Sequence, residues 1–441
     1  MTDTLPDRQQ RPADEQPSYE TGGLRLALLV GSLVALGVLA GWAWVAIILG
    51  VVVMIFLHEL GHFVTAKWSG MKVTEFFIGF GPRIWSFTRG ETTYGFKVIP
   101  GGAYVRIVGM NNLDEADPAD EPRTYRQQSF PKRLLVVSAG SIMHLLQAFV
   151  LLVVLLGVVG VPGGTLTGDV TPVAWDVSEI TPNSAAEDAG LRDGDRIVAI
   201  DGEQASSFDN LSEALAGYEV GDEVDFTIER GGGTETVPAE LQPRPEGQAG
   251  GEVGSPFLGV KSSAYYPTER IGVGSAIASA PGEMVTFMRE AVGAMAELFS
   301  PSGLGDFADN VSTAGEEAPE RDTGGGAQAS GDDGSDNRLI SIYGAVRLGA
   351  QLSEQGWAPV LVLFFSINIF IAIVNMVPLP PLDGGHAAVA VYERIRSRGG
   401  RRYHADMAKL LPLTYAVVMG MILLGMASLY LDIVNPIPID G

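Results

Sequence analysis

One short motif in the sequence has residue types and spacing that suit metal chemistry. His58, Glu59 and His62 form a His-Glu-Leu-Gly-His run at the end of an apolar stretch. On a helix, positions i and i+4 share one face, so both imidazoles can bind one metal ion, while Glu59 can accept a proton from a water that the metal polarises. A match of three fixed letters also arises by chance. The context favours a metal site, because ionisable groups inside an apolar helix are costly unless they are ligated or paired.

A catalytic zinc site usually has three protein ligands, so a third is expected from another part of the chain. The chain has no cysteine, which excludes thiolate zinc sites and disulfides. The candidate is Asp383, within the run Asn-Met-Val-Pro-Leu-Pro-Pro-Leu-Asp-Gly-Gly at 375–385. Its prolines and glycines break a helix at membrane depth, where irregular backbone is tolerated only inside protein or beside a wet cavity. Taken alone, Asp383 fits a turn between two spans equally well.

The elements that must position these residues are apolar. Hydrophobic residues make up 46% of the 441 residues, and mean hydropathy is +0.20. Five segments are long enough for a membrane crossing, and tryptophan and tyrosine lie near several of their ends. They occupy about 24–40, 42–66, 134–160, 356–378 and 409–432. We therefore expect a polytopic α-helical membrane protein with about five spans, although 24–66 is also compatible with one long bent helix.

The charge is distributed unevenly along the chain. Residues 161–354 hold 34 acidic and 10 basic side chains, whereas the rest holds 18 and 19. No basic stripe is available for phosphates, so nucleic acid is not an expected partner. Ten lysines and arginines lie in 67–133 and six in 379–409. The positive-inside tendency places these two loops in the cytoplasm and the acidic segment outside the cell membrane.

The acidic segment contains a soluble module. Short alternating runs such as Val-Asp-Phe-Thr-Ile-Glu-Arg at 224–230 predict strands, and 208–217 predicts a short helix. The expected domain order is a disordered cytoplasmic tail at 1–23, a first membrane part at 24–160, a mostly-β domain at 165–262, an amphipathic helix at 271–300, a disordered acidic linker at 302–337 and a second membrane part at 338–436.

Together, the two motifs resemble the site-2 protease family of intramembrane zinc proteases. The likeness extends over about 42–436 and is greatest to bacterial members with an extracytoplasmic PDZ domain, especially actinobacterial regulators of sigma-factor signalling. It implies that His58, His62 and Asp383 bind Zn2+ and that Glu59 is the general base. It also implies that Asn375 lies near the scissile peptide bond.

Two further regions carry the resemblance. Phe-Phe-Ile-Gly-Phe-Gly-Pro at 76–82 and the run at 99–110 look like the family's membrane-dipping β-hairpin, at about 75–110. Its exposed strand edge could pair with an unwound substrate helix, which makes Gly101, Gly102 and Tyr104 candidate substrate-binding residues. The alternative is a simple cytoplasmic hairpin turned at Gly101 and Gly102.

The run at 180–202 and Phe-Leu-Gly-Val at 257–260 resemble a bacterial PDZ domain. Such domains bind extended peptides or C-termini by adding a strand. The alternative is a plug that limits access to the membrane core, and the sequence does not separate the two.

The sequence departs from the family pattern at two places. Family members usually carry Gly-Pro-x-x-Asn early in the third apolar run, whereas this chain has Gly140-Ser-Ile-Met-His144. His144 is either a fourth metal ligand or, as we favour, a histidine facing the interior of the helix bundle. His386 is expected beside the ligands rather than among them. The leading span at 24–40 is also additional to the family core.

The resemblance implies regulated intramembrane proteolysis: hydrolysis of a peptide bond within the bilayer, in a single-span membrane protein already trimmed on its outer side. Anti-sigma factors are the implied substrates. Two rival hypotheses remain, an inactive metal-binding scaffold that presents its PDZ domain and a metal transporter. A scaffold would be expected to lose one of the four active-site residues, and a transporter would tolerate Glu59→Gln.

Overall fold

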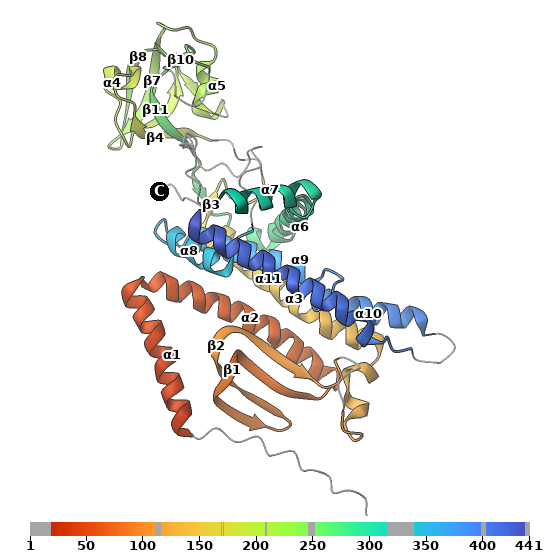
Figure 1. The fold of residues 1–441 in the computed structure, drawn as a ribbon. Helices are drawn as coiled ribbons and strands as arrows, with labels where there is room; N and C mark the ends of the chain where they lie inside the picture. The colour runs from red at the N-terminus through yellow and green to blue at the C-terminus, as the bar shows by residue number, and fades with distance from the viewer. Residues whose placement is uncertain are drawn as a thin grey trace, which may run out of the picture. The chain divides into compact units, whose positions relative to one another are not determined.

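The computed structural model describes residues 19–110, 116–168, 170, 172–207, 210–245, 252–314, 339–397 and 403–436. The chain divides into two compact units, Met1–Val150 with Leu339–Gly441, and Leu151–Arg338. Each unit buries a hydrophobic core of its own. The first unit contains long apolar helices and a β-sheet, and the second contains the predicted soluble module (Figure 1).

Four helical stretches among the described residues are long and apolar enough to cross a membrane, so the chain is a polytopic α-helical membrane protein. They are α2 (Trp42–Trp68), α3 (Phe130–Val154) with the π-helical turn Leu155–Val159, α9 (Trp357–Asn375) and α11 (Leu411–Val434) with the 3-10 turn Met407–Leu410. The first predicted span forms α1 (Tyr19–Leu39), whose apolar part, Gly23–Leu39, is shorter than the other four.

The segment at 24–66 forms two helices rather than one bent helix. Gly41 separates α1 from α2 and has φ +102°, a conformation that favours glycine. The disordered tail was predicted to cover 1–23, but α1 begins at Tyr19, so the last five residues of that range are helical. Residues 1–18 lie outside the described part of the chain.

A β-sheet follows α2 directly. It is built from β1 (Val73–Arg89) and β2 (Thr92–Ile107), and the chain reverses at Gly90, which has φ +65°. The second strand folds back on itself, so that Phe77 pairs with Tyr104 in a stretch of β2 antiparallel to it and with Gly95 in a stretch that runs in the same direction. Gly101 and Gly102 lie within β2, in the stretch between Phe96 and Ala103 where β2 changes direction, so the alternative of a simple hairpin turned at these glycines stays a prediction.

A buried core joins this sheet to three helices. It is composed of Ala66, Met71, Val73, Ile107, Tyr125, Val136, Val137 and Ala387, which come from α2, the loop after it, the sheet, α3, α10 (Asp383–Arg396) and the 3-10 turn Tyr125–Gln127. A second 3-10 turn, Glu121–Arg123, precedes it. On another side of α2, the short helix α8 (Ile342–Leu352) packs near α9 through Val346 and Val360. These contacts fix the ends of the helices that carry the chemistry-bearing residues.

The second unit contains the predicted mostly-β domain. Its main sheet has the order β11-β4-β5-β7-β8, with β6 paired to β5. The strands are β4 (Ala174–Ile180), β5 (Arg196–Ile200), β6 (Glu203–Gln204), β7 (Glu223–Arg230), β8 (Gly233–Glu240) and β11 (Val260–Tyr265), with helices α4 (Ala185–Ala189) and α5 (Leu211–Leu215) and a 3-10 turn, Ala205–Ser207. In β7, Val224, Phe226 and Ile228 are buried alternately, as the sequence predicts. The predicted helix at 208–217 is shorter in the structure, and residues 208 and 209 lie outside the described part.

Short strand pairs flank this sheet. They are β3 (Val161–Pro162) with β12 (Thr268–Glu269), and β9 (Gln242–Pro243) with β10 (Pro256–Phe257). The predicted closing strand at 257–260 is therefore divided between the end of β10 and the start of β11.

The helix predicted at 271–300 is α6 (Val273–Leu298). The linker predicted at 302–337 is wrong at its start, because α7 (Pro301–Thr313) is helical there. Ser300 accepts a hydrogen bond from the Gly303 N–H, and Pro301 occupies the first turn, where it needs no partner for an N–H. Residues 315–338 of the predicted linker lie outside the described part.

Candidate metal centre

Helix α2 places the two motif histidines side by side. Their Nε2 atoms are 3.2 Å apart, and both side chains are buried. This proximity follows from helical geometry, because residues four apart lie one above the other.

Asp383 reaches the same point from the far end of the sequence. It is the first residue of α10, after seven non-helical residues that follow the end of α9. Its Oδ2 atom lies 3.3 Å from the Nε2 of His62 and 3.6 Å from the Nε2 of His58. A Cβ on Gly384 would lie 2.3 Å from the carbonyl oxygens of Met376 and Val377. The glycine after Asp383 therefore lets the preceding loop pack against the first turn of α10.

These three residues fit a metal ion. They form the one group of three potential ligands found among the described residues, with ligand atoms within 4.8 Å of one another. The Asp383 Oδ2 atom is buried, and no hydrogen bond of ordinary geometry reaches it from the described part of the chain. Two imidazoles and one carboxylate also match the donor set of catalytic zinc sites, which leave a fourth position for water or substrate.

A backbone carbonyl of α3 orients His62. The Nδ1 atom of His62 lies 2.7 Å from the Val136 carbonyl oxygen. Because a carbonyl only accepts, Nδ1 is the donor, and Nε2 presents its lone pair toward Asp383 and His58. Such an outer contact fixes both the tautomer and the ring orientation of a metal-binding histidine.

Gly140 allows α3 to approach the site this closely. A Cβ at this position would lie 2.2 Å from His58 Cε1 and 2.5 Å from His62 Nε2. The sequence singled out the Gly140-Ser-Ile-Met-His144 run as a departure from the family pattern, but it did not show that Gly140 faces the imidazoles.

His144 lies beside the three-residue group but outside it. Its ring centroid is 4.9 Å from that of His58, and its Nδ1 is 2.8 Å from the Asn368 Oδ1. Asn368 in turn donates to the Phe364 carbonyl. Sequence reasoning missed Asn368, although a buried amide inside an apolar helix is itself a signal. His386 is also outside the group and lies one turn after Asp383 on α10.

Glu59 is adjacent to the group and is held by the sheet. Its carboxylate accepts a hydrogen bond from the Val105 N–H of β2 and interacts electrostatically with His62 and Asp383. It is not among the three clustered ligands. Its carboxylate is therefore placed near the ligands without being one of them.

The remaining predicted substrate-binding residues lie outside this group. Asn375 is the last residue of α9, and Gly101 and Gly102 lie within β2. The Tyr104 hydroxyl donates to the Glu75 carboxylate and accepts a hydrogen bond of 2.9 Å from Lys97 Nζ. The Tyr104 hydroxyl is therefore engaged within the sheet.

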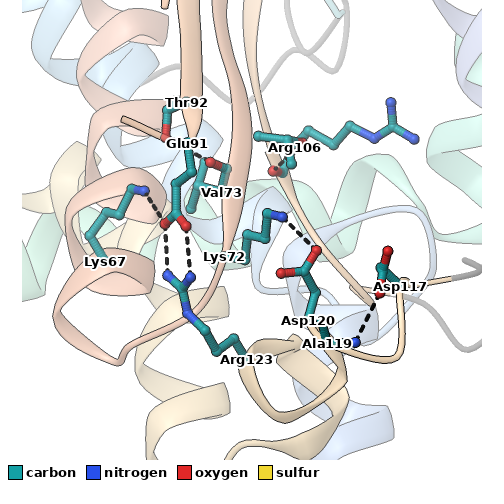
Figure 2. Close-up of polar contacts among 11 residues, drawn as sticks. Lys67, Lys72, Val73, Glu91, Thr92, Arg106, Asp117, Ala119, Asp120 and Arg123 are labelled. Atoms are coloured by element: carbon teal, nitrogen blue, oxygen red, sulfur yellow. Dashed lines mark hydrogen bonds and ion pairs between the residues drawn. The ribbon is translucent and has the colours of Figure 1, made fainter. Parts of the chain in front are cut away.

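A charged cluster ties the end of α2 to the turn of the sheet. Glu91, in the turn between β1 and β2, accepts hydrogen bonds of 2.7 Å from both Nη atoms of Arg123 and of 2.8 Å from Lys67 Nζ (Figure 2). These hydrogen bonds from Arg123 and Lys67 lower the pKa of Glu91 from 4.5 to about 2. Lys67 is five residues after His62, so the cluster connects the sheet to the helix that carries both histidines.

Comparisons with known proteins identify the family of the chain. The profile described as "Peptidase family M50" matches residues 46–319 and 327–423. The chain belongs to peptidase family M50. The zinc metalloprotease Rip1 of Mycobacterium tuberculosis is 33% identical over 417 residues, which cover 88% of this M50 chain and 96% of Rip1. Rip1 of Mycolicibacterium smegmatis is 30% identical, with coverages of 89% and 97%.

The resemblance to site-2 proteases is thereby confirmed, and this M50 protein is an intramembrane zinc metalloprotease. Among solved structures, the PDZ domain of an SdrC-like protein from Listeria monocytogenes covers 22% of this chain and 93% of its own length, at 23% identity and a TM-score of 0.18.

Gly140→Ala should damage the metal centre, because the added methyl group meets both imidazoles. We expect zinc affinity to fall by at least about 10-fold, the scale seen when ligand orientation is lost. Chelator competition on the detergent-solubilised chain measures this affinity. Gly420→Ala in α11 is the matched control, since no atom lies within 4 Å of the added Cβ. Equal zinc affinity in the two variants would contradict the close approach of α3.

Glu91→Gln should destabilise the chain by about 1 kcal/mol at pH 7, the range for partly exposed ion pairs. The depressed pKa of Glu91 means that its stabilisation is complete above pH 4.5 and is lost as pH falls toward 2. The difference between the unfolding midpoints of wild type and variant should therefore shrink across that window. Glu219→Gln, on an exposed side chain of the β domain, should show no such difference.

Proposed function

We propose that His58, His62 and Asp383 hold the catalytic zinc and that Glu59 is the general base of peptide-bond hydrolysis. The observation that carries this proposal is the convergence of two imidazoles and one carboxylate from opposite ends of the membrane part, within 4.8 Å of one another. When bound, zinc polarises the scissile carbonyl and lowers the pKa of the attacking water.

The residues of the chain supply orientation and proton transfer. Glu59 accepts the proton of the attacking water and then delivers it to the leaving amine. The hydrogen bond from the Val105 N–H supports this role, because it holds the Glu59 carboxylate at the ligands without placing it among them. Val136 keeps the His62 ring in the tautomer that a metal ligand needs.

The proposed substrates are membrane proteins with a single span, cut within the bilayer after their outer part has been trimmed. Anti-sigma factors belong to this class, and the family resemblance favours them. A helix must unwind before its carbonyls can be reached, and a strand edge can pair with the unwound segment. In β2, the residues from Ala103 to Ile107 pair with β1 on one side, which supports pairing with substrate along the other side. Gly101, Gly102, Tyr104 and Asn375 are the residues that we propose to lie along the bound segment.

We further propose that the mostly-β domain faces the outside of the cell membrane. The support is the uneven charge: basic residues concentrate in 67–133 and 379–409, and acidic residues in 161–354. A peptide-binding role and a plugging role for this domain both remain compatible with its sheet.

Glu59→Gln keeps the shape of the side chain and removes the proton acceptor. We expect folding and zinc binding to survive while cleavage of a co-expressed single-span reporter falls by about 10²-fold or more. His58→Ala is the matched variant, because it should reduce zinc occupancy as well as cleavage. Cleavage by Glu59→Gln at the wild-type rate would overturn the assignment and favour the metal transporter or scaffold hypothesis.

Single cysteines can test the orientation, because the natural chain has none. Ser330→Cys should react with a membrane-impermeant maleimide in intact cells, since it lies in the acidic segment. Asn112→Cys and Gly399→Cys, which lie in the basic loops, should react only after permeabilisation. The cysteine-free wild type reports background labelling, and a reversed pattern would show that the β domain faces the cytoplasm.

A further inference from the structure

A buried ion pair joins α3 to α10 on the cytoplasmic side proposed above. The Nη1 atom of Arg133 lies 2.6 Å from the Oε2 atom of Glu393, and the two side chains are 11% and 4% exposed. The Tyr125 ring lies 4.9 Å from the Arg133 guanidinium, and the Ala405 N–H donates to Glu393 Oε1 at 2.6 Å. The pair therefore belongs to a built network of charged and polar groups rather than to a solvated surface.

The two helices that this pair joins also meet at the metal centre. Three residues after Arg133, the Val136 carbonyl binds His62, and one turn further Gly140 faces both imidazoles. On the other helix, Asp383 lies ten residues before Glu393, which is about 15 Å along an α-helix. The ion pair thus joins α3 to α10 directly, and the histidines of α2 provide a second attachment between them at the metal centre.

Between the ion pair and the metal centre, a small residue makes the contact of α10 with α3. Ala387 packs with Val136 and Val137, whereas Gly384 and Gly385 face the loop after α9. Small side chains permit close approach, but they interdigitate little and fix the register of two helices only weakly. A buried charge pair fixes register well, because a shift of one residue leaves both charges buried and unpaired.

We propose that Arg133 and Glu393 are positioning residues for Asp383: their ion pair sets the register of α10 along α3 and so places the third ligand against the two imidazoles. His386 lies between the two attachments, one turn from Asp383, and lines one small cavity with both members of the pair. This inference rests on the proposed zinc ligands and adds the groups that hold one of them in place.

A register role can be separated from a contribution to stability. Replacing both members of a buried ion pair by apolar residues is often neutral or stabilising, whereas removing one leaves a charge unpaired. The double variant Arg133→Met with Glu393→Leu should therefore fold, while α10 loses the interaction that fixes its register.

The experiment compares zinc binding in full-length, detergent-solubilised chains. For the double variant we expect the unfolding midpoint in excess chelator to stay near that of wild type, while zinc affinity falls 10- to 100-fold. The d–d absorption of bound Co2+ should also change, because it reports the geometry of the ligand set. Arg133→Lys retains the charge pair and should recover affinity toward wild type. The control is Lys72→Met with Asp120→Leu, a pair that does not involve α10 (Figure 2).

Wild-type zinc affinity and an unchanged Co2+ spectrum in the folded double variant would overturn the proposal. If the double variant does not fold, the single variant Glu393→Gln is measured instead, at a temperature below its unfolding midpoint. Wild-type zinc affinity in this variant would also overturn the proposal. A different result would show that the proposed zinc ligands themselves are wrong. In that case His58→Ala, introduced alone, would leave zinc binding unaltered.

Discussion

Two imidazoles and a carboxylate meet inside a part of the chain that is otherwise apolar, and the surrounding structure depends on compensating for them. Helix α2 is long and apolar enough to cross a membrane, yet its later turns carry His58, Glu59 and His62. Uncompensated, each such group costs several kcal/mol at membrane depth. The proposed zinc ion would satisfy His58, His62 and Asp383, and a backbone N–H of the sheet satisfies Glu59.

This compensation requires backbone to come very near the ligands. Gly140 brings α3 against both imidazoles, and Gly384 and Gly385 bring the loop after α9 against the first turn of α10. Small residues at these points allow tight packing but provide little shape to resist sliding. Polar interactions away from the proposed metal site can prevent such sliding, and we propose that the buried Arg133–Glu393 ion pair does so between α3 and α10.

The sheet after α2 connects the proposed substrate-binding edge to the proposed general base. Its β2 strand donates the Val105 N–H to Glu59, and its turn carries the Glu91 cluster that holds the end of α2. A movement of the sheet would therefore displace the proposed general base and the helix that carries two of the proposed ligands. Close coupling of this kind suits a protease that must first accommodate an unwound segment and then activate water beside it.

The features that the sequence determined by itself are those with a local physical cause. The spacing of His58 and His62 brings their rings together on any helix, and long apolar runs predict spans because backbone groups in lipid must be satisfied within a helix. Alternation of apolar residues predicted the strands of the β domain, as in β7. Element boundaries were predicted less well where helix caps and turns decide them. The start of α7 depends on Ser300 and Pro301 at its first turn, and the sheet reverses at Gly90 as well as between Phe96 and Ala103.

Only the tertiary structure decided which distant residues share the site. Val136 meets His62 across 74 positions, and Asn368 meets His144 across 224. The sequence also did not show which neighbours Gly140, Arg133 and Glu393 face. On a uniformly apolar or mixed helix, the direction in which a residue points depends on its packing partners. Motif resemblance supplied Asp383 as the proposed third ligand, whereas residue spacing alone was equally compatible with an ordinary turn residue. The physical reason is general: periodicity and capping act over a few residues, but helix register and close approach are set by contacts between segments far apart in the chain.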